Sequence, residues 1–162
     1  MEVEAFRHSG FSFEGPDNLT SSALNIKLRV RKRFAFSSAL KRMSVVIEGA
    51  GNTMFVFTKG APEVLSDKLD QIPSDYARTY QFHMTRGKRV IALAYKQLPS
   101  GSLSSSRDVI REDVESKLMF LGFLIFDCDL KPDTKGVMKE LIASDHKVLS
   151  IAHTLKLDYF SV

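Results

Sequence analysis

Lys59 stands at a corner of the chain that could bind an anion. The preceding residues, 55–58, are strand formers, and Gly60, Ala61 and Pro62 have the composition of a helix start. A strand that ends on Lys59 and passes into a helix at Pro62 leaves free backbone N–H groups beside an ammonium group. Such a corner suits a phosphate group or a nucleotide. The same residues also suit an ordinary surface corner, so local geometry leaves both interpretations open.

A second candidate is the basic stretch between Asn18 and Ile47, which contains no Asp or Glu. In residues 26–36, apolar and basic side chains alternate, which predicts a half-buried strand with a solvated basic face. Nucleic acid is one partner for such a patch, but aromatic residues do not interleave with the basic face as base stacking requires. We therefore predict no nucleic-acid binding. The predicted apolar face holds Ile26, Leu28, Val30, Phe34 and Phe36, and the basic face holds Lys27, Arg29, Arg31 and Arg33.

Metal binding is not predicted. The four histidines have no metal-ligand spacing with one another or with the single cysteine, Cys128. Three aspartates after residue 126 could suggest a metal or phosphate site, although a hinge between domains explains them as well. One cysteine excludes an internal disulfide and fits a reducing compartment. The histidines are His8, His83, His146 and His153, and the aspartates are Asp127, Asp129 and Asp133.

The composition is that of a globular protein. With 162 residues, 44% hydrophobic and 26% charged, the chain has room for one domain, or one domain and part of another. The longest apolar run, residues 118–126, is about half as long as a helix needs to be to cross a bilayer. No N-terminal segment has the pattern of a signal peptide. We therefore predict a soluble, cytoplasmic chain without a membrane span.

Elements that could position Lys59 follow in an informative order. Strands joined by short turns predict an antiparallel meander, and two helices and a further strand come after it. A flexible surface loop and a short charged helix complete this part. The strands are expected at 26–36, 43–49, 53–59 and 87–98, with a turn at 49–52, helices at 62–69, 74–85 and 107–117, and the loop at 99–106.

From residue 118 the pattern changes. Residues 118–126 are apolar on both faces, which is typical of a central strand in a parallel sheet. A helix in 131–144, with Val137, Met138, Leu141 and Ile142 facing inward, and a strand at 146–152 would complete one βαβ unit. We therefore predict an antiparallel α+β domain at 1–117, a partial α/β domain at 118–150, and a divergent tail at 151–162.

Four stretches resemble the nucleotide-binding domain of P-type ATPases and its return into the phosphorylation domain. The resemblance extends from about Ile26 to Val148, and its most specific motif is KGAPE at residues 59–63. LKPDT at 130–134, in place of the Asp-Pro-Pro-Arg of calcium and sodium pumps, resembles the type V class. Residues 36–45 and 114–126 resemble its A subgroup, the endoplasmic-reticulum helix dislocases among the cation-transporting ATPases. The four stretches are FAFSSALKRMSVV, FTKGAPEVL, GKRVIALAYK and FLIFDCDLKPDTKGVMKEL.

This resemblance implies an antiparallel sheet with flanking helices, followed by an incomplete α/β segment of the HAD-like type. It also implies that ATP binds on the sheet, with Phe36 stacked on adenine and Lys41, Lys59 and Arg89 around the nucleotide. Gly60 would let the backbone approach the base closely. The alternative for Phe36 is a core position beside Phe34, and Lys41 and Arg89 could be solvated strand ends.

The sequence lacks the family's Asp-Lys-Thr-Gly-Thr and Thr-Gly-Asp-Gly motifs, so it offers no catalytic residue for phosphoryl transfer. The resemblance implies a parent enzyme on the endoplasmic reticulum that hydrolyses ATP with Mg²⁺ and drives transport. The phosphorylation domain would be this domain's partner, and the chain alone is predicted to be inactive. Two alternatives are a non-catalytic nucleotide-binding or regulatory fragment, and a basic module that binds an anionic partner through residues 27–33.

Overall fold

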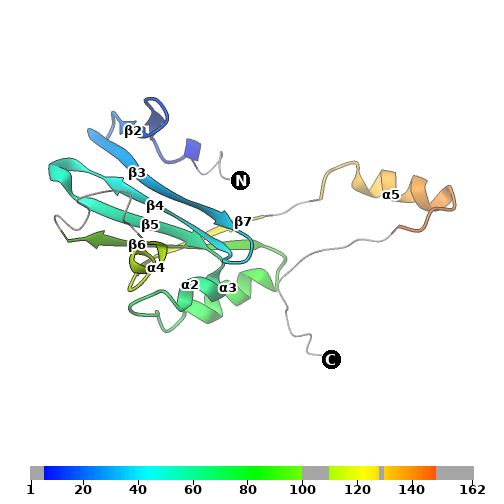
Figure 1. The fold of residues 1–162 in the computed structure, drawn as a ribbon. Coiled ribbons are helices and arrows are strands. Elements are labelled where there is room, and N and C mark those ends of the chain that lie inside the picture. The colour runs from blue at the N-terminus through cyan, green and yellow to red at the C-terminus, as the bar shows by residue number, and fades with distance from the viewer. Residues whose placement is uncertain (1–5, 100–109, 128–129, 149–162) are drawn as a thin grey trace. The chain divides into compact units, whose positions relative to one another are not determined.

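The computed structural model describes residues 6–99, 110–127 and 130–148, and its main feature is a seven-stranded antiparallel sheet (Figure 1). Each strand pairs with the next one along the chain, so the predicted antiparallel meander is confirmed and extended. The first two strands were not predicted. The strands are β1 (Ser12–Phe13), β2 (Asn18–Ser21), β3 (Ile26–Ser37), β4 (Arg42–Glu48), β5 (Met54–Gly60), β6 (Arg89–Leu98) and β7 (Met119–Phe126).

The helices are short, and the predicted ones are present. A 3-10 turn, η1 (Ala50–Asn52), joins β4 to β5 at the predicted position. The predicted loop at 99–106 lies, apart from Pro99, outside the described residues, as do residues 107–109 of the predicted charged helix. The helices are α2 (Pro62–Ser66), α3 (Tyr76–Met84), α4 (Arg111–Val114) and α5 (Thr134–Ala143).

One face of the sheet, the covered face, carries α2, α3 and α4 (Figure 1). Along β4 and β5, buried residues alternate with residues that keep part of their surface exposed, as expected for a sheet with one face against a core. We call the second face the open face. Two apolar clusters form the core, one of Val46, Val56, Leu98 and Val114, the other of Leu65, Tyr76, Ala92, Ala94 and Leu118.

A bulge in β3 makes the prediction of a single apolar face for residues 26–36 wrong. Val30 pairs with Ile47, but Lys32 pairs with Val46, so β3 has one residue more than β4 over this stretch. Paired residues share a face of the sheet, and Val46 and Ile47 lie on opposite faces. The alternation therefore changes face, and Phe34 packs against the covered cluster around Val46. The four basic residues of the predicted solvated face are all exposed, as predicted.

The prediction that residues 118–126 form a central strand of a parallel sheet is wrong. β7 pairs antiparallel with β6 and is the last strand of the sheet. Its covered face packs Phe120 and Phe123 against Tyr76, with ring centroids 4.9 Å apart in both pairs. Met119 and Leu121, in contrast, are 57% and 52% exposed. An apolar composition on both faces did not mean burial on both faces.

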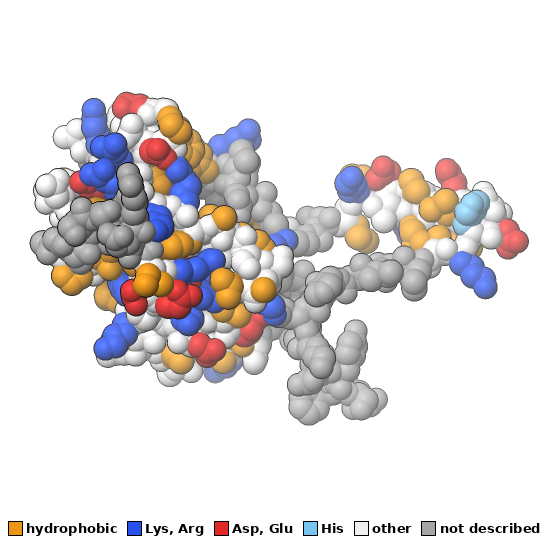
Figure 2. All heavy atoms as spheres, viewed as in Figure 1, with side chains coloured by type: hydrophobic (Ala, Val, Ile, Leu, Met, Phe, Trp, Pro, Cys, Tyr) orange, Lys and Arg blue, Asp and Glu red, His pale blue; other side chains and the backbone are white. Residues whose placement is uncertain are grey.

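The chain divides into two compact units, Met1–Cys128 and Asp129–Val162. The strand predicted to open a second domain at residue 118 thus belongs to the first unit. In the second unit α5 is present, but none of its residues is buried, so the predicted inward packing of Val137, Met138, Leu141 and Ile142 is wrong; Figure 2 shows apolar side chains on its surface. Of the predicted strand at 146–152, residues 146–148 are not in a strand, and the others lie outside the described residues, as does the tail at 151–162.

Limited digestion with trypsin should cut α5 before it cuts the sheet. A ten-residue helix without buried side chains lacks the tertiary packing that stabilises short helices. Cleavage after Lys135 and Lys139 is therefore expected well before cleavage after Lys59 and Lys96, which lie in paired strands. Mass spectrometry over a time course measures the order. Equal rates at the two sets of lysines would show that α5 is held as firmly as the sheet.

Candidate functional site

The predicted binding residues lie together at one end of the sheet. β3 ends there at Ser37, β4 begins at Arg42, and β5 ends at Gly60, which pairs with both Arg42 and Ala92. β6 begins three residues before Ala92, so its first residue lies at this same end. We call this region the Lys59 end. It contains Phe36, Lys41, Lys59, Gly60 and Arg89.

Lys59 belongs to the open face. It pairs with Met43 and Leu93, whereas its neighbours Thr58 and Gly60 are buried on the covered face. Arg89 lies four residues before Leu93 on β6, hence on the same face and about 13 Å further along the strand. The two cations therefore border one stretch of the open face.

An aromatic surface continues the open face beyond Lys59. Phe57 stacks on Tyr95 with ring centroids 6.0 Å apart and an interplanar angle of 20°, and Phe55 lies 6.3 Å from Phe57. Phe57 remains 37% exposed. The Lys59 end thus combines cationic side chains with neighbouring aromatic rings. A nucleotide suits both, because its phosphates attract cations and its base can stack on a ring.

Lys41 is brought to Lys59 by the turn between β3 and β4. Its N–H donates to the carbonyl of Ser37 at 2.7 Å, and its own carbonyl accepts from the N–H of Ala61 at 3.0 Å. Its Nζ lies 3.5 Å from Oε1 of Glu63, in a pair that is largely open to solvent. The turn and the corner after Lys59 are therefore hydrogen-bonded neighbours, although they are distant in sequence.

The corner itself differs from the predicted anion site. α2 does start at Pro62, but it has only five residues, and the Ala61 N–H is already bonded to Lys41. The prediction of free backbone donors is wrong at Ala61. Any anion at this corner would depend mainly on the side chains of Lys41 and Lys59.

Phe36 is 61% exposed, so the alternative of a core position beside Phe34 is wrong. It lies in a second irregular stretch of β3, where the register shifts between Phe34 and Ser37. Arg89 is also exposed. An exposed ring and an exposed guanidinium group at the same end of a sheet are available to a planar or anionic ligand.

Gly60 has a packing role that sequence reasoning did not identify. A Cβ at this position would lie 2.7 Å from Cβ of Arg42 and 2.9 Å from the carbonyl oxygen of Lys41. The missing side chain thus permits close approach of β4 to β5 at the Lys59 end. The predicted approach of the Gly60 backbone to a nucleotide base remains a prediction.

A buried polar cluster beneath the Lys59 end was also missed. The Glu115 carboxylate accepts from Arg42 Nε at 2.5 Å, Ser44 Oγ at 2.5 Å and Arg111 Nε at 2.8 Å, and its side chain is fully buried. The Ser44 hydroxyl gives its only proton to the carboxylate, so Thr58 Oγ1, 2.9 Å away, donates to Ser44. We call these five residues the Glu115 cluster. Arg42 and Glu115 are 73 positions apart, so no local pattern indicates the contact.

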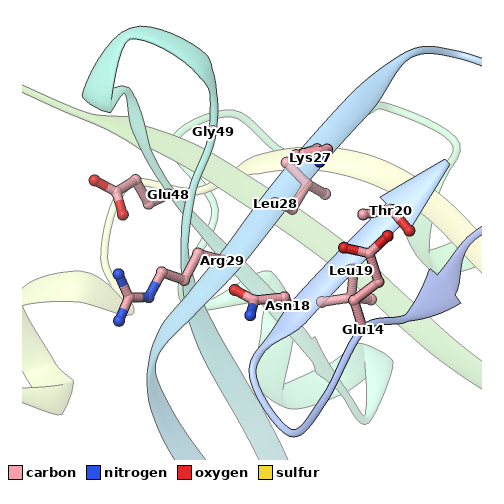
Figure 3. Close-up of a pocket in the computed structure, with 9 residues that line it drawn as sticks. All are labelled: Glu14, Asn18, Leu19, Thr20, Lys27, Leu28, Arg29, Glu48 and Gly49. Atoms are coloured by element: carbon pink, nitrogen blue, oxygen red, sulfur yellow. The ribbon is translucent and has the colours of Figure 1, made fainter. Parts of the chain in front are cut away.

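A shallow hollow lies at the other end of β4 (Figure 3). Its lining carries both acidic and basic side chains, so it has no strong preference for an anion. Nearby, Arg31 pairs with Glu48 at 2.6 Å and Arg33 pairs with Asp17, and Figure 2 shows acidic and basic groups side by side over β2 and β3. These pairs neutralise part of the positive charge of β3. The hollow is lined by Glu14, Asn18, Leu19, Thr20, Lys27, Leu28, Arg29, Glu48 and Gly49.

Two further kinds of site are not found in the part of the chain that the structure describes. Within residues 6–99, 110–127 and 130–148, no three histidine, cysteine or acidic side chains are grouped so that they could hold a metal ion. None of the helices in these ranges combines the length and the apolar character needed to cross a membrane.

Comparisons with known proteins agree with the fold. The family model of the P-type ATPase cytoplasmic domain N matches residues 19–132. The chain is 46% identical over 125 residues to the endoplasmic reticulum transmembrane helix translocase of Saccharomyces cerevisiae, a match that covers 77% of this chain and 10% of the relative. It is 41% identical over 124 residues to the probable manganese-transporting ATPase PDR2 of Arabidopsis thaliana, covering 76% and 10% of the two chains. The probable cation-transporting ATPase 13A4 of Gallus gallus is 41% identical over 146 residues, covering 89% and 12%. The chain thus spans about a tenth of the length of these relatives.

Proposed function

Because this chain belongs to the type V P-type ATPases and carries their cytoplasmic N domain, we propose that it binds ATP at the Lys59 end of its sheet. The observation that carries the proposal is the convergence of one exposed aromatic ring and three cationic side chains on that end. These groups come from β5, β6 and the end of β3 with its following turn. They could not meet without the antiparallel pairing that the sheet provides.

Each side chain has a role in the proposed site. Phe36 stacks on the adenine ring, which suits an aromatic side chain that is mostly exposed. Lys59 and Arg89 meet phosphate oxygens with charge-assisted hydrogen bonds from the open face. Lys41 also binds a phosphate oxygen, and it gives up its contact with Glu63 to do so. That contact is weak, because the two groups are 3.5 Å apart and solvated.

We further propose that the parent protein is an ATP-driven translocase of the endoplasmic-reticulum membrane, with this domain on the cytosolic side. The support is that the three relatives reported above, each named a translocase or a transporting ATPase, share more than two fifths of their aligned residues with the chain. Residues 36–45 and 114–126 favour the A subgroup. In the parent, the phosphorylation domain is the partner of this domain, and it supplies the aspartate and the Mg²⁺ site for hydrolysis.

ATP is expected to bind weakly to this chain, with a dissociation constant on the order of 0.1 to several mM, because an open sheet face provides only a stack and a few charge-assisted contacts. Lys59→Ala and Phe36→Ala should each weaken binding by roughly 1 to 2 kcal/mol, or about 5- to 30-fold. A titration of the ¹⁵N-labelled chain followed by NMR measures the constants and locates the shifted amides.

Lys27→Ala is the matched control, since it removes the same charge from β3 at the hollow rather than at the Lys59 end. It should leave ATP affinity nearly unchanged. If Lys27→Ala weakened ATP binding as much as Lys59→Ala, the anion would be binding to the basic residues of β3 near the hollow, and the proposed site would be wrong.

A further inference from the structure

The Glu115 cluster is connected to the turn that carries Lys41. Arg42 Nη1 donates to the Leu40 carbonyl at 3.3 Å, and Arg111 Nη2 donates to the Arg42 carbonyl at 2.9 Å. The carbonyls on both sides of Lys41 are therefore held from the covered face. Both guanidinium groups are in turn held by the Glu115 carboxylate.

Lys41 needs such support because of its backbone conformation. Its φ of 48° lies in the left-handed region, which non-glycine residues adopt at an energetic cost. The surrounding hydrogen bonds over-determine this conformation: Lys41 N–H binds the Ser37 carbonyl, and the Lys41 carbonyl binds Ala61 N–H. The direction in which the Lys41 side chain points therefore depends on groups on the covered face of the sheet.

Glu115 is itself firmly placed. It directly follows α4, and a lysine of β6 bonds the backbone on both sides of it. Lys96 Nζ, from β6, donates to the Asp113 carbonyl at 2.8 Å and to the Ser116 carbonyl at 2.7 Å, one on each side of the pair Val114 and Glu115. The backbone on both sides of Glu115 is thus bonded to the sheet, so its carboxylate can serve as a fixed point for the two arginines.

We propose that Glu115 is a positioning residue for the ATP site, which fixes Arg42 and Arg111 so that the β3–β4 turn presents Lys41 and Phe36 at the Lys59 end. This inference rests on the proposed function. The Ala61 N–H to Lys41 carbonyl bond transmits the effect, because a displaced turn also displaces the corner after Lys59. Glu115 touches no nucleotide in this arrangement and acts only through the two arginines.

The test compares ATP affinity and amide exchange in Glu115→Gln, Arg111→Met and the control Val114→Ala. Glu115→Gln keeps the shape of the side chain and removes its charge, and Arg111→Met removes the bond to the Arg42 carbonyl. Val114→Ala perturbs the same helix through apolar packing and has no polar side-chain contact to lose. Each variant is titrated with ATP by NMR at a temperature at which thermal unfolding curves show that it is folded.

Glu115→Gln and Arg111→Met should each weaken ATP binding about three- to tenfold, while Val114→Ala should change it less than about twofold. In the two polar variants without ATP, the amides of Lys41 and Ala61 should exchange with solvent faster than in Val114→Ala. A purely stabilising role for Glu115 would not produce this difference, because all three folded variants would then bind ATP alike.

A folded Glu115→Gln chain with wild-type affinity would overturn the inference and leave the proposed function intact. Equal weakening by Val114→Ala would also overturn it. If Glu115→Gln does not fold, Arg111→Met decides by the same criteria. If the wild-type chain shows no ATP-dependent shifts at the Lys59 end, the proposed function itself fails, and the role of Glu115 in ATP binding fails with it.

Discussion

Glu115→Ala is expected to lower the free energy of unfolding of this chain by about 3 to 5 kcal/mol. The reason is that it removes the carboxylate that pairs with two guanidinium groups beneath the sheet, where Arg42 and Arg111 have side chains only 9% and 15% exposed. The Ser44 hydroxyl also loses its acceptor. Since domains of this size are stable by only about 5 to 15 kcal/mol, this variant should be close to unfolding at room temperature.

Urea denaturation followed by circular dichroism measures the effect. Glu112→Ala is the matched control, because Glu112 is an exposed acidic residue of α4, which directly precedes Glu115, and it should change stability by less than about 0.5 kcal/mol. Similar losses in the two variants would mean that the Glu115 contacts contribute little, as exposed ion pairs do.

The effect of Glu115→Ala should also depend on pH. Burial by itself raises the pKa of the Glu115 carboxyl, but hydrogen bonds from Ser44, Arg111 and Arg42 outweigh burial and lower the pKa below 4.5. A carboxyl with a lower pKa in the folded chain stabilises the fold above its unfolded pKa, and this contribution is lost as the pH falls through the folded pKa. The stability difference between the wild type and Glu115→Ala should therefore be full at neutral pH and shrink below about pH 4.5. A difference that stays constant into acid would contradict the assigned ionisation.

Tyr76→Ala should have an effect of similar size, with a loss of about 3 to 5 kcal/mol. Tyr76 is 2% exposed and packs edge-on against Phe120 at 4.9 Å and Tyr80 at 5.7 Å, so it joins α3 to the strand at the sheet edge. Its hydroxyl donates to the Pro62 carbonyl at 2.8 Å, and burial raises its pKa, which keeps this donor protonated. Removing the ring leaves a cavity between α2, α3 and the sheet.

Two further variants separate the contribution of the Tyr76 hydroxyl from that of its buried ring, and compare a buried ring with an exposed one. Tyr76→Phe keeps the ring and leaves the Pro62 carbonyl without its donor, for an expected loss of about 1 to 2 kcal/mol. Phe36→Ala removes an aromatic ring that is 61% exposed and should cost less than about 1 kcal/mol. The same urea experiment measures all three. A loss for Phe36→Ala as large as that for Tyr76→Ala would show that Phe36 is a core residue and is not available to a ligand.

Local sequence patterns determined most of the secondary structure of this protein. Alternation in residues 43–49 and 53–59 predicted β4 and β5, and Pro62 marked the start of α2 at the correct residue. These signals are reliable because they reflect local backbone geometry: successive side chains of a strand point to opposite faces, and Pro fits the first position of a helix. The KGAPE motif and the segments around it also identified the family, which the match to residues 19–132 confirms.

Residues 26–36 and 118–126 show where the local pattern was insufficient. The bulge that moves Phe34 to the covered face is an extra residue in pairing with β4, and such a mismatch exists only once two strands are aligned. A strand that is apolar on both faces is typical of a parallel sheet between helices, but here it is an edge strand with one packed and one exposed face. Only the pairing of β7 with β6 separates these possibilities.

For the candidate site, too, the contributions of the sequence and of the tertiary structure can be separated. From the sequence, the resemblance carried by KGAPE and the neighbouring stretches was sufficient to propose a nucleotide site at Phe36, Lys41, Lys59 and Arg89. The tertiary structure decided that these residues lie at one end of one sheet, and that the turn bearing Lys41 is held by Glu115. The contact between Arg42 and Glu115 joins residues 73 positions apart, and its strength depends on burial that no local window of sequence contains, because burial is a property of the assembled core.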